Sequence, residues 1–405
     1  MAIGKFNLND AGALFKIKYE KLSENIYNSA NVLLGRCKKS YNFVGEKMRI
    51  AVPQSFAGGV GSGSLPTASK AKYGKAEISA KKVYARVEID RETIKAALKD
   101  EGSFVRATKE VVKKGVESYM RNLSRILFSD GSGKLGDISS GSGSADMIIT
   151  DASFKEANFE EGDLVDITET DGSSNVSVKA QGLEILAVDP DAKKVTLSAS
   201  VSATGGSTLT SIYMQNSKDN DPEGLAGVIQ KASGGKNAYG ITSDRRWSSV
   251  EENALSAAVS TDLLNKVMLS VEKKCGKAPN LIVCSYKQYE KILNLLEDQK
   301  RYTVSTRAGL KTKSGADVSF SGVEFMSSSG PVGIFPERFC DDDKVYFLND
   351  NHIHFYHRPD FGWFDDDGTV FLRHASEDSY EARYGGYFNI YINPAFHGVL
   401  KNLSV

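Results

Sequence analysis

The hydrophobic positions change their period several times along the chain, from helical spacing to strand spacing and back. Residues 11–34 carry apolar side chains near helical spacing, which predicts an amphipathic helix that packs on its own domain or on a neighbouring subunit. Apolar and polar residues then alternate over 47–52 and 76–89, which predicts two strands. Residues 55–73 between them are rich in glycine, serine and small side chains, so we expect a long, flexible loop at the tip of a hairpin.

The longest helical signal runs over 103–128, with Ser103 as its cap and one apolar stripe along its length. Its other faces carry lysine and arginine, Arg121 and Arg125 included, which are expected to be mostly solvated charges. Residues 129–144 are rich in glycine and serine and predict a linker. Short alternating runs over 163–203 then predict a small β-barrel inserted into a larger domain.

The second half of the chain has an α/β pattern. A helix is expected over 260–275, a short buried strand over 281–284, and another helix from Ser285. This order predicts a core sheet covered by helices. Beyond about Thr312 the chain is strand-rich to its end.

Composition narrows the function classes. Lys and Arg number 51 and Asp and Glu number 51, so the formal net charge is zero. This balance argues against a dedicated nucleic-acid binder but allows a protein that encloses nucleic acid without gripping it. The four cysteines are scattered and are expected to be free thiols in a reducing compartment. No apolar run is long enough for a membrane span or a signal peptide, so synthesis in a cytoplasm is expected.

Three of the five histidines fall within 352–357. On a strand, His352 and His354 share a face, whereas His357 points the opposite way. A metal site needs three or four converging ligands, and no acidic residue stands in register with this pair, so we expect no metal there. The more favoured interpretation is ordinary packing.

Other motifs give catalysis no support. The glycines of 59–63 lack the preceding strand and following helix that a phosphate-binding loop requires. The acidic triplets 341–343 and 365–367 lack the spacing of a calcium loop and are expected to be solvated turns. No nucleophile elbow is present, so no catalytic, cofactor-binding or metal-binding residue is assigned.

The order of these elements resembles the major capsid proteins of tailed bacteriophages, which share the Hong Kong phage fold. Four local phrases look similar to those proteins, and they lie at 224–229, 245–247, 386–390 and 393–400. The resemblance implies an α+β fold with an added β-barrel. It also implies the following division: N-terminal arm 1–42, extended loop 43–89, peripheral domain with spine helix 90–148, inserted barrel 149–216, axial domain 217–350, and returning peripheral strands 351–405.

The resemblance also implies a function. The protein would be a structural protein and not an enzyme, self-assembling as pentamers and hexamers into an icosahedral shell around a double-stranded DNA genome. It would need no cofactor, would meet DNA without sequence-specific contacts, and would not contact a membrane. A separate scaffolding protein, a portal and decoration proteins are the other expected partners. The shell would be assembled in the cytoplasm of the bacterial host and become part of the virion.

Lys70, Lys72 and Lys75, at the loop tip and the strand after it, are the candidates for contact with a neighbouring subunit, by pairing with its carboxylates. One branch of the resembling family joins lysine to asparagine by isopeptide bonds, but most members do not, and no residue here is assigned that role.

Three other functions stay open at this stage. An encapsulin-type nanocompartment shell would share the fold, although encapsulins are typically shorter and lack the inserted barrel. A β-rich surface adhesin would need an aromatic-lined site, whereas residues 163–203 contain no aromatic residue. An enzyme would depend on the histidine cluster alone.

Overall fold

The structure is a computed structural model. It describes residues 32–40, 43, 45, 47–55, 63, 72–90, 101–229, 237–242, 246–298, 310–311, 317–318, 323–328, 330–358, 362–364, 368, 370, 372–373 and 378–405. The predicted helix over 11–34 lies largely outside these residues, as does most of the loop tip. Among the helices that are described, none combines the length and the apolar character that crossing a membrane requires.

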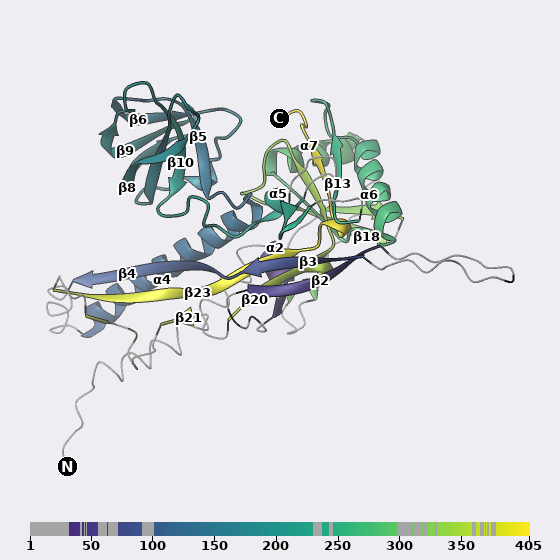
Figure 1. Cartoon of the computed structure of the whole chain (residues 1–405), viewed down its shortest axis with the longest axis horizontal. Helices are drawn as coiled ribbons and strands as arrows, with labels where there is room; N and C mark the ends of the chain where they lie inside the picture. Colours follow the sequence, from purple (N-terminus) through teal and green to yellow (C-terminus); the bar gives the residue numbers. More distant parts are fainter. Residues whose placement is uncertain are drawn as a thin grey trace, which may run out of the picture.

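A long β-ribbon runs beneath the rest of the molecule (Figure 1). Strand β4 (Lys81–Asp90) pairs antiparallel with β23 (Ser379–Ile392) over ten residues. The two backbones approach closely at Gly385, where a Cβ atom would lie 2.2 Å from the carbonyl oxygen of Val83. The ribbon sheet is completed by β1 (Lys38–Ser40), β20 (Ile353–His357), β21 (Gly362–Trp363) and β22 (Leu372–Arg373).

Helix α4 (Glu101–Phe128) lies on one face of this ribbon, which confirms the predicted long helix. Its buried side chains include Tyr119 and Leu123, and the ring of Tyr119 meets that of Tyr384 edge-on at 5.3 Å. A Cβ atom on Gly115 would lie 2.5 Å from Cγ2 of Val87, so a side chain larger than hydrogen would push the helix off the strand. The apolar stripe seen in the sequence therefore faces the ribbon.

The barrel is a closed sheet of six strands, and it takes in more of the chain than the sequence predicted. Residues 129–144 were expected to be a linker, yet two barrel strands begin within them, and the barrel had been expected to start at 149. Leu135 and Met147 are buried inside it, and without their strands the sheet could not close. The sequence analysis missed these strands because their few apolar residues stand among many glycines and serines. The barrel strands, in chain order, are β5 (Lys134–Ser140), β6 (Ser144–Ile149), β7 (Leu164–Thr170), β8 (Val176–Asp189), β9 (Lys194–Val201) and β10 (Thr208–Met214).

The α/β unit is a six-stranded mixed sheet with two helices. Helix α6 (Thr261–Cys275) matches its predicted span: Ser260 caps it by accepting a hydrogen bond from Leu263 N, and Gly276 ends it at φ 72°. Helix α7 (Tyr286–Asp298) follows β14 as expected. The strands, in sheet order, are β13 (Val250–Asn253), β24 (Gly398–Lys401), β19 (Val345–Leu348), β14 (Leu281–Cys284), β18 (Gly330–Pro336) and β17 (Val323–Ser327).

Strand β24 corrects the predicted division of the chain. It had been grouped with the returning peripheral strands of 351–405, but it lies between β13 and β19 in the α/β unit. Val399 and Leu400 are buried there. A pairing between residues about 150 positions apart leaves no local trace in the sequence.

The hairpin of β2 (Lys47–Ser55) and β3 (Lys72–Ser79) confirms the two predicted strands. Its described part packs on the body of its own chain, because Val52, Ala76 and Ile78 are buried in the main core. Helix α2 (Val32–Arg36) belongs to the same core.

Gly224 should tolerate no side chain, because its Cβ atom would lie 2.3 Å from the carbonyl oxygen of Ile126 at the end of α4. We expect Gly224→Ala to lower the free energy of unfolding by about 1–3 kcal/mol, the usual cost of overpacking. The matched control is Gly205→Ala, where a Cβ atom meets nothing within 4 Å. Denaturant unfolding of both variants tests this, and equal stability of the two would contradict the close approach.

Candidate functional site

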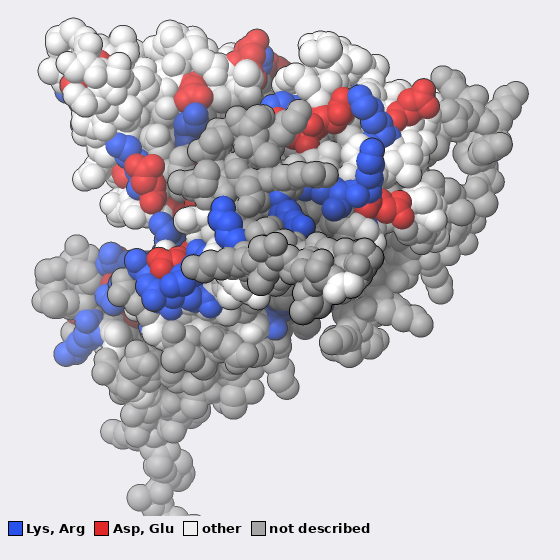
Figure 2. All heavy atoms as spheres, turned by 45° about the vertical axis from the view of Figure 1, so that its right-hand side comes forward, with Lys and Arg blue, Asp and Glu red and all other residues white. Residues whose placement is uncertain are grey.

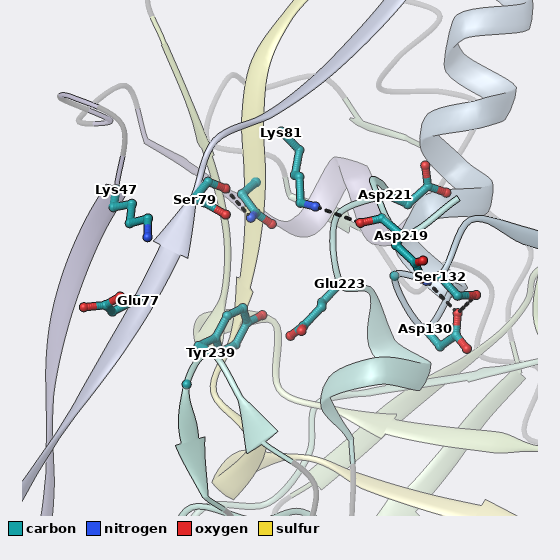
Figure 3. A pocket seen from close by; sticks show the side chains of 13 residues that line it. Lys47, Glu77, Ser79, Lys81, Asp130, Ser132, Asp219, Asp221, Glu223 and Tyr239 are labelled. Carbon is teal, nitrogen blue, oxygen red and sulfur yellow. Dashed lines mark hydrogen bonds between the residues drawn. The ribbon is translucent and has the colours of Figure 1, made fainter. Parts of the chain in front are cut away.

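The hairpin, the end of α4 and the two chain segments that carry the barrel meet around one cavity of about 560 Å³ (Figure 3). Lys47 of the hairpin and Lys81, the first residue of β4, line one side of it. Carboxylates from the barrel's two connecting segments, 130–133 and 217–223, line the opposite side. The cavity therefore marks the point where the three parts of the molecule are joined.

The carboxylates of the cavity have different surroundings. Burial raises the pKa of Glu223, although Lys81 acts in the opposite direction. Burial would also raise the pKa of Asp130, but hydrogen bonds from Ser132 Oγ (2.5 Å) and Ser132 N (3.0 Å) outweigh it, so this pKa is lowered. Lys81 Nζ donates to the carbonyl oxygen of Asp219 at 3.4 Å, which links the ribbon to the barrel's return segment.

A buried ion pair closes this junction. Arg125 of α4 donates to Asp221 at 2.7 Å, and each side chain is only 6% exposed. The same guanidinium donates from Nε (3.0 Å) and NH2 (2.8 Å) to Asn122 Oδ1. Arg125 was expected to be solvated, and that expectation is wrong, because the return segment of the barrel covers it.

Two further ionic contacts hold the barrel from either side. Arg121 of α4 pairs with Glu160 and Asp163 at the base of the barrel, so it is not a solvated charge either. Lys155 pairs with Asp341 of the α/β unit and donates to the carbonyl oxygen of Phe339 at 3.2 Å. The barrel is therefore fixed to both the long helix and the α/β unit.

The pKa values of Asp163 and Asp341 are shifted in opposite directions. Burial raises the pKa of Asp163 and outweighs the cation of Arg121. Burial would likewise raise the pKa of Asp341, but Lys155 and Lys344 together lower it. The contact with the α/β unit thus holds a stable carboxylate anion between two lysines.

The predicted inter-subunit lysines are only partly described. Lys72 and Lys75 lie on β3 and are exposed, and neither makes an ion pair with any residue that the structure describes. Lys70 lies outside the described residues. The two described lysines are available to a partner, and their predicted contact with a neighbouring subunit stays a prediction.

The histidines are packed among aromatic side chains. His352 stacks on Phe396 with ring centroids 3.6 Å apart, and His354 stacks on Tyr356 at 5.8 Å. His397 is fully buried and accepts a hydrogen bond from Asn349 N at 3.2 Å, and burial lowers its pKa to about 3. Within the described part of the chain, no group of three His, Cys, Asp or Glu residues could hold a metal ion.

The acidic triplet 341–343 is part of a loop rather than a calcium site. Asp341 pairs with Lys155 and Lys344, and Asp342 pairs with Lys287 at 2.8 Å. The prediction that this triplet is a solvated turn is thus wrong for Asp341, which bridges the barrel and the α/β unit. The second triplet, 365–367, lies outside the described residues.

One family model matches part of the chain. Residues 193–362, from the end of the barrel through most of the α/β unit, match the family model of the SU10 major capsid protein. The matched segment, 170 of the 405 residues, is similar to a family of major capsid proteins. This is a structural family and not an enzyme family, as the sequence predicted.

The predicted fold is confirmed as well. Among the described elements, the hairpin, the long helix, the inserted barrel, the α/β unit and the returning strand β23 follow one another in the order expected for the Hong Kong phage fold.

The chain is also similar to several solved structures, whereas no curated protein sequence matches it. A capsid asymmetric unit of cyanophage A-1(L) is 11% identical over 91% of each chain, with a TM-score of 0.47. A structure of Gordonia phage Cozz is 10% identical over 92% of this chain and 86% of that one, with a TM-score of 0.43. The SrpI encapsulin complex of Synechococcus elongatus is 8% identical over 92% and 87%, with a TM-score of 0.42.

Removing one partner of the buried pair should be costly. We expect Asp221→Ala to destabilise the protein by about 3–5 kcal/mol, because the buried Arg125 would lose the carboxylate to which it is hydrogen-bonded. Glu77→Ala, which breaks the exposed Arg49–Glu77 pair (2.9 Å), is the control and should cost about 1 kcal/mol or less. Denaturant unfolding of the unassembled protein measures both. An equal loss of unfolding free energy in the two variants would show that the buried pair stabilises the fold no more than the exposed pair does.

Stability should also depend on pH through Glu337, at the end of β18. Burial raises the pKa of this carboxyl from 4.5 to about 7. Above about pH 4.5 the unfolded chain loses this proton while the folded chain keeps it, so the unfolding free energy should fall by about 3 kcal/mol as pH rises to 7. Glu337→Gln should remove this decline and be more stable than the parent protein at pH 8. Unchanged pH dependence in the variant would assign the decline to another group.

Proposed function

We propose that the capsid protein assembles as pentamers and hexamers into an icosahedral shell around the double-stranded DNA genome of a tailed phage. The observation that carries this proposal is the family match of residues 193–362 within a chain that has the hairpin, the long helix and the ribbon around it. Many modest contacts, repeated over a closed symmetric shell, would give high stability without any single tight interface.

The parts of the chain receive roles in this proposal. Residues 1–42 would form an arm, and 43–89 would be the extended loop that reaches a neighbouring subunit. The ribbon and α4 would form the peripheral domain. The α/β unit, with β24 included, would be the axial domain that meets its copies around the capsomer axis. The barrel, whose strands span 134–214, would be the inserted domain.

Other partners follow from the assembly pathway. We propose that a separate scaffolding protein and a portal take part, and that decoration proteins join the finished shell. Assembly would take place in the cytoplasm of the bacterial host. The packaged DNA would be met without sequence-specific contacts, in agreement with the zero net charge of the chain.

Charge reversal on the hairpin tests the proposed loop contact. The double variant Lys72→Glu/Lys75→Glu should fail to form closed particles, or form them only at several-fold higher protein concentration, because two cations facing neighbouring carboxylates would become anions. Lys193→Glu on the barrel is the control and should assemble normally. Negative-stain electron microscopy and sedimentation, with the protein expressed alone and with its scaffold, provide the measurement.

The same preparations test the function itself. Closed particles or isolated pentamers and hexamers are expected of the unsubstituted protein. A monomer that persists under all conditions would contradict the proposal. Particles that enclose a protein cargo instead of DNA would favour a nanocompartment shell.

A further inference from the structure

The zero net charge of the chain hides a strong asymmetry. Residues 134–214, which form the barrel, contain 5 Lys and Arg against 13 Asp and Glu, a net charge of −8. The rest of the chain has 46 against 38 and therefore carries +8. The barrel and the ribbon sheet lie on opposite sides of α4, since Arg121 holds the barrel and Tyr119 meets the ribbon (Figure 1). The barrel is thus strongly acidic, and the excess of basic residues lies in the rest of the chain.

The ribbon sheet has one face that α4 does not cover. Val83 and Val87 of β4 point into the core under the helix, so Lys82, Tyr84 and Arg86 point the other way. These three are exposed, and Tyr84 keeps 45% of its surface in contact with solvent. Figure 2 shows Lys and Arg side chains on the body below the barrel, with Asp and Glu side chains beside several of them.

Aromatic rings hold two cations in place on this face. Tyr387 pairs with Lys82 across the ribbon, and its ring lies 5.5 Å from Lys82 Nζ and 4.7 Å from Arg358 Cζ. The ring of Tyr84 meets that of Tyr387 edge-on at 6.5 Å. Arg358 Nη2 donates a hydrogen bond to the carbonyl oxygen of Gly45 at 2.8 Å. Neither Lys82 nor Arg358 pairs with a carboxylate among the described residues, so no described carboxylate neutralises either charge.

The neighbouring arginines are already partly neutralised. Arg86 and Arg383 share Glu381, with Arg86 Nε 2.7 Å from one carboxylate oxygen, and Arg86 also pairs with Glu88 at 3.2 Å. The net charge of this face therefore depends on Lys82 and Arg358, which are the two residues to test.

We propose that this face of the ribbon sheet, defined by Lys82, Tyr84, Arg358 and Tyr387, is the inner surface of the shell and binds the phosphate backbone of the packaged DNA. This inference rests on the proposed function. Fixed cations on a flat face fit a ligand with regularly spaced anions, and such contacts are independent of sequence. The acidic barrel faces away from the DNA, which removes eight net negative charges from its vicinity.

A neighbouring copy's acidic barrel is a weaker candidate for this face. The barrel and the basic face lie on opposite sides of α4 in every copy. In a closed shell one molecule thick, copies meet edge to edge, so the barrel of one cannot reach the opposite side of the next.

DNA binding by the unassembled capsid protein tests the two cations. Fluorescence anisotropy with a duplex of arbitrary sequence, over a range of salt concentrations, gives the slope of log K against log salt. Losing two phosphate contacts in Lys82→Gln/Arg358→Gln should make this slope shallower by about 1.8, and Lys82→Gln alone by about 0.9. The control Lys193→Gln/Lys194→Gln, on the barrel, should leave the slope unchanged.

Three outcomes would overturn the inference. The first is an unchanged slope in the double variant. The second is an unsubstituted protein that binds no DNA at low salt. The third is binding of an acidic polypeptide, but not of DNA, that is lost in the double variant, which would assign the face to a protein partner.

Labelling of closed particles tests the orientation separately. Tyr84→Cys on the basic face should react with a bulky polyethylene-glycol maleimide only after the shell is disrupted. Leu186→Cys, at a barrel position that is 52% exposed, should react in intact particles. The unsubstituted protein gives the baseline of its native cysteines. If intact closed particles react with the maleimide at Tyr84→Cys, the inference is overturned but the proposed function is not. If no closed particles form, the proposed function is overturned.

Discussion

The packing of α4 on the β4–β23 ribbon is the contact on which the rest of the structure depends. The helix approaches the strand so closely at Gly115 and Val87 that only a glycine fits there. This contact sets the distance between the helix and the sheet. The position of the barrel, which contacts the helix, depends on it in turn. The last turns of α4 present Arg121 and Arg125 to the barrel, and the chain leaves the helix directly into the first barrel strand.

Ion pairs join the barrel and its two connecting segments to the rest of the molecule. Its two connecting segments are joined to α4 through the Arg125–Asp221 pair, and Lys155 reaches across to the α/β unit. Ionic contacts of this kind fix direction as well as distance, because the buried charges have few alternative partners.

The chemistry of the molecule is that of a structural protein. The titratable groups with the largest pKa shifts, among them His397 and Glu337, owe them chiefly to burial inside the fold. The histidines that stood out in the sequence are stacked on aromatic rings, and the acidic loop 341–343 supplies ion pairs between two parts of the chain. Ion pairs join different parts of this chain. On the proposed function, charged side chains would also join the shell to its DNA.

The sequence by itself determined the elements whose signals are local. The long helix, the capped helix α6 with Ser260 and Gly276 at its ends, and the two hairpin strands follow from side-chain period and turn chemistry within a few residues. Lys72 and Lys75 could likewise be read as exposed charges. Only the tertiary structure decided that β5 and β6 close the barrel, that β24 belongs to the α/β unit, and that Arg125 is buried. Each of these depends on a partner far away in the chain, and a pairing of that kind is specified by the packing of the whole fold and not by its neighbours in sequence.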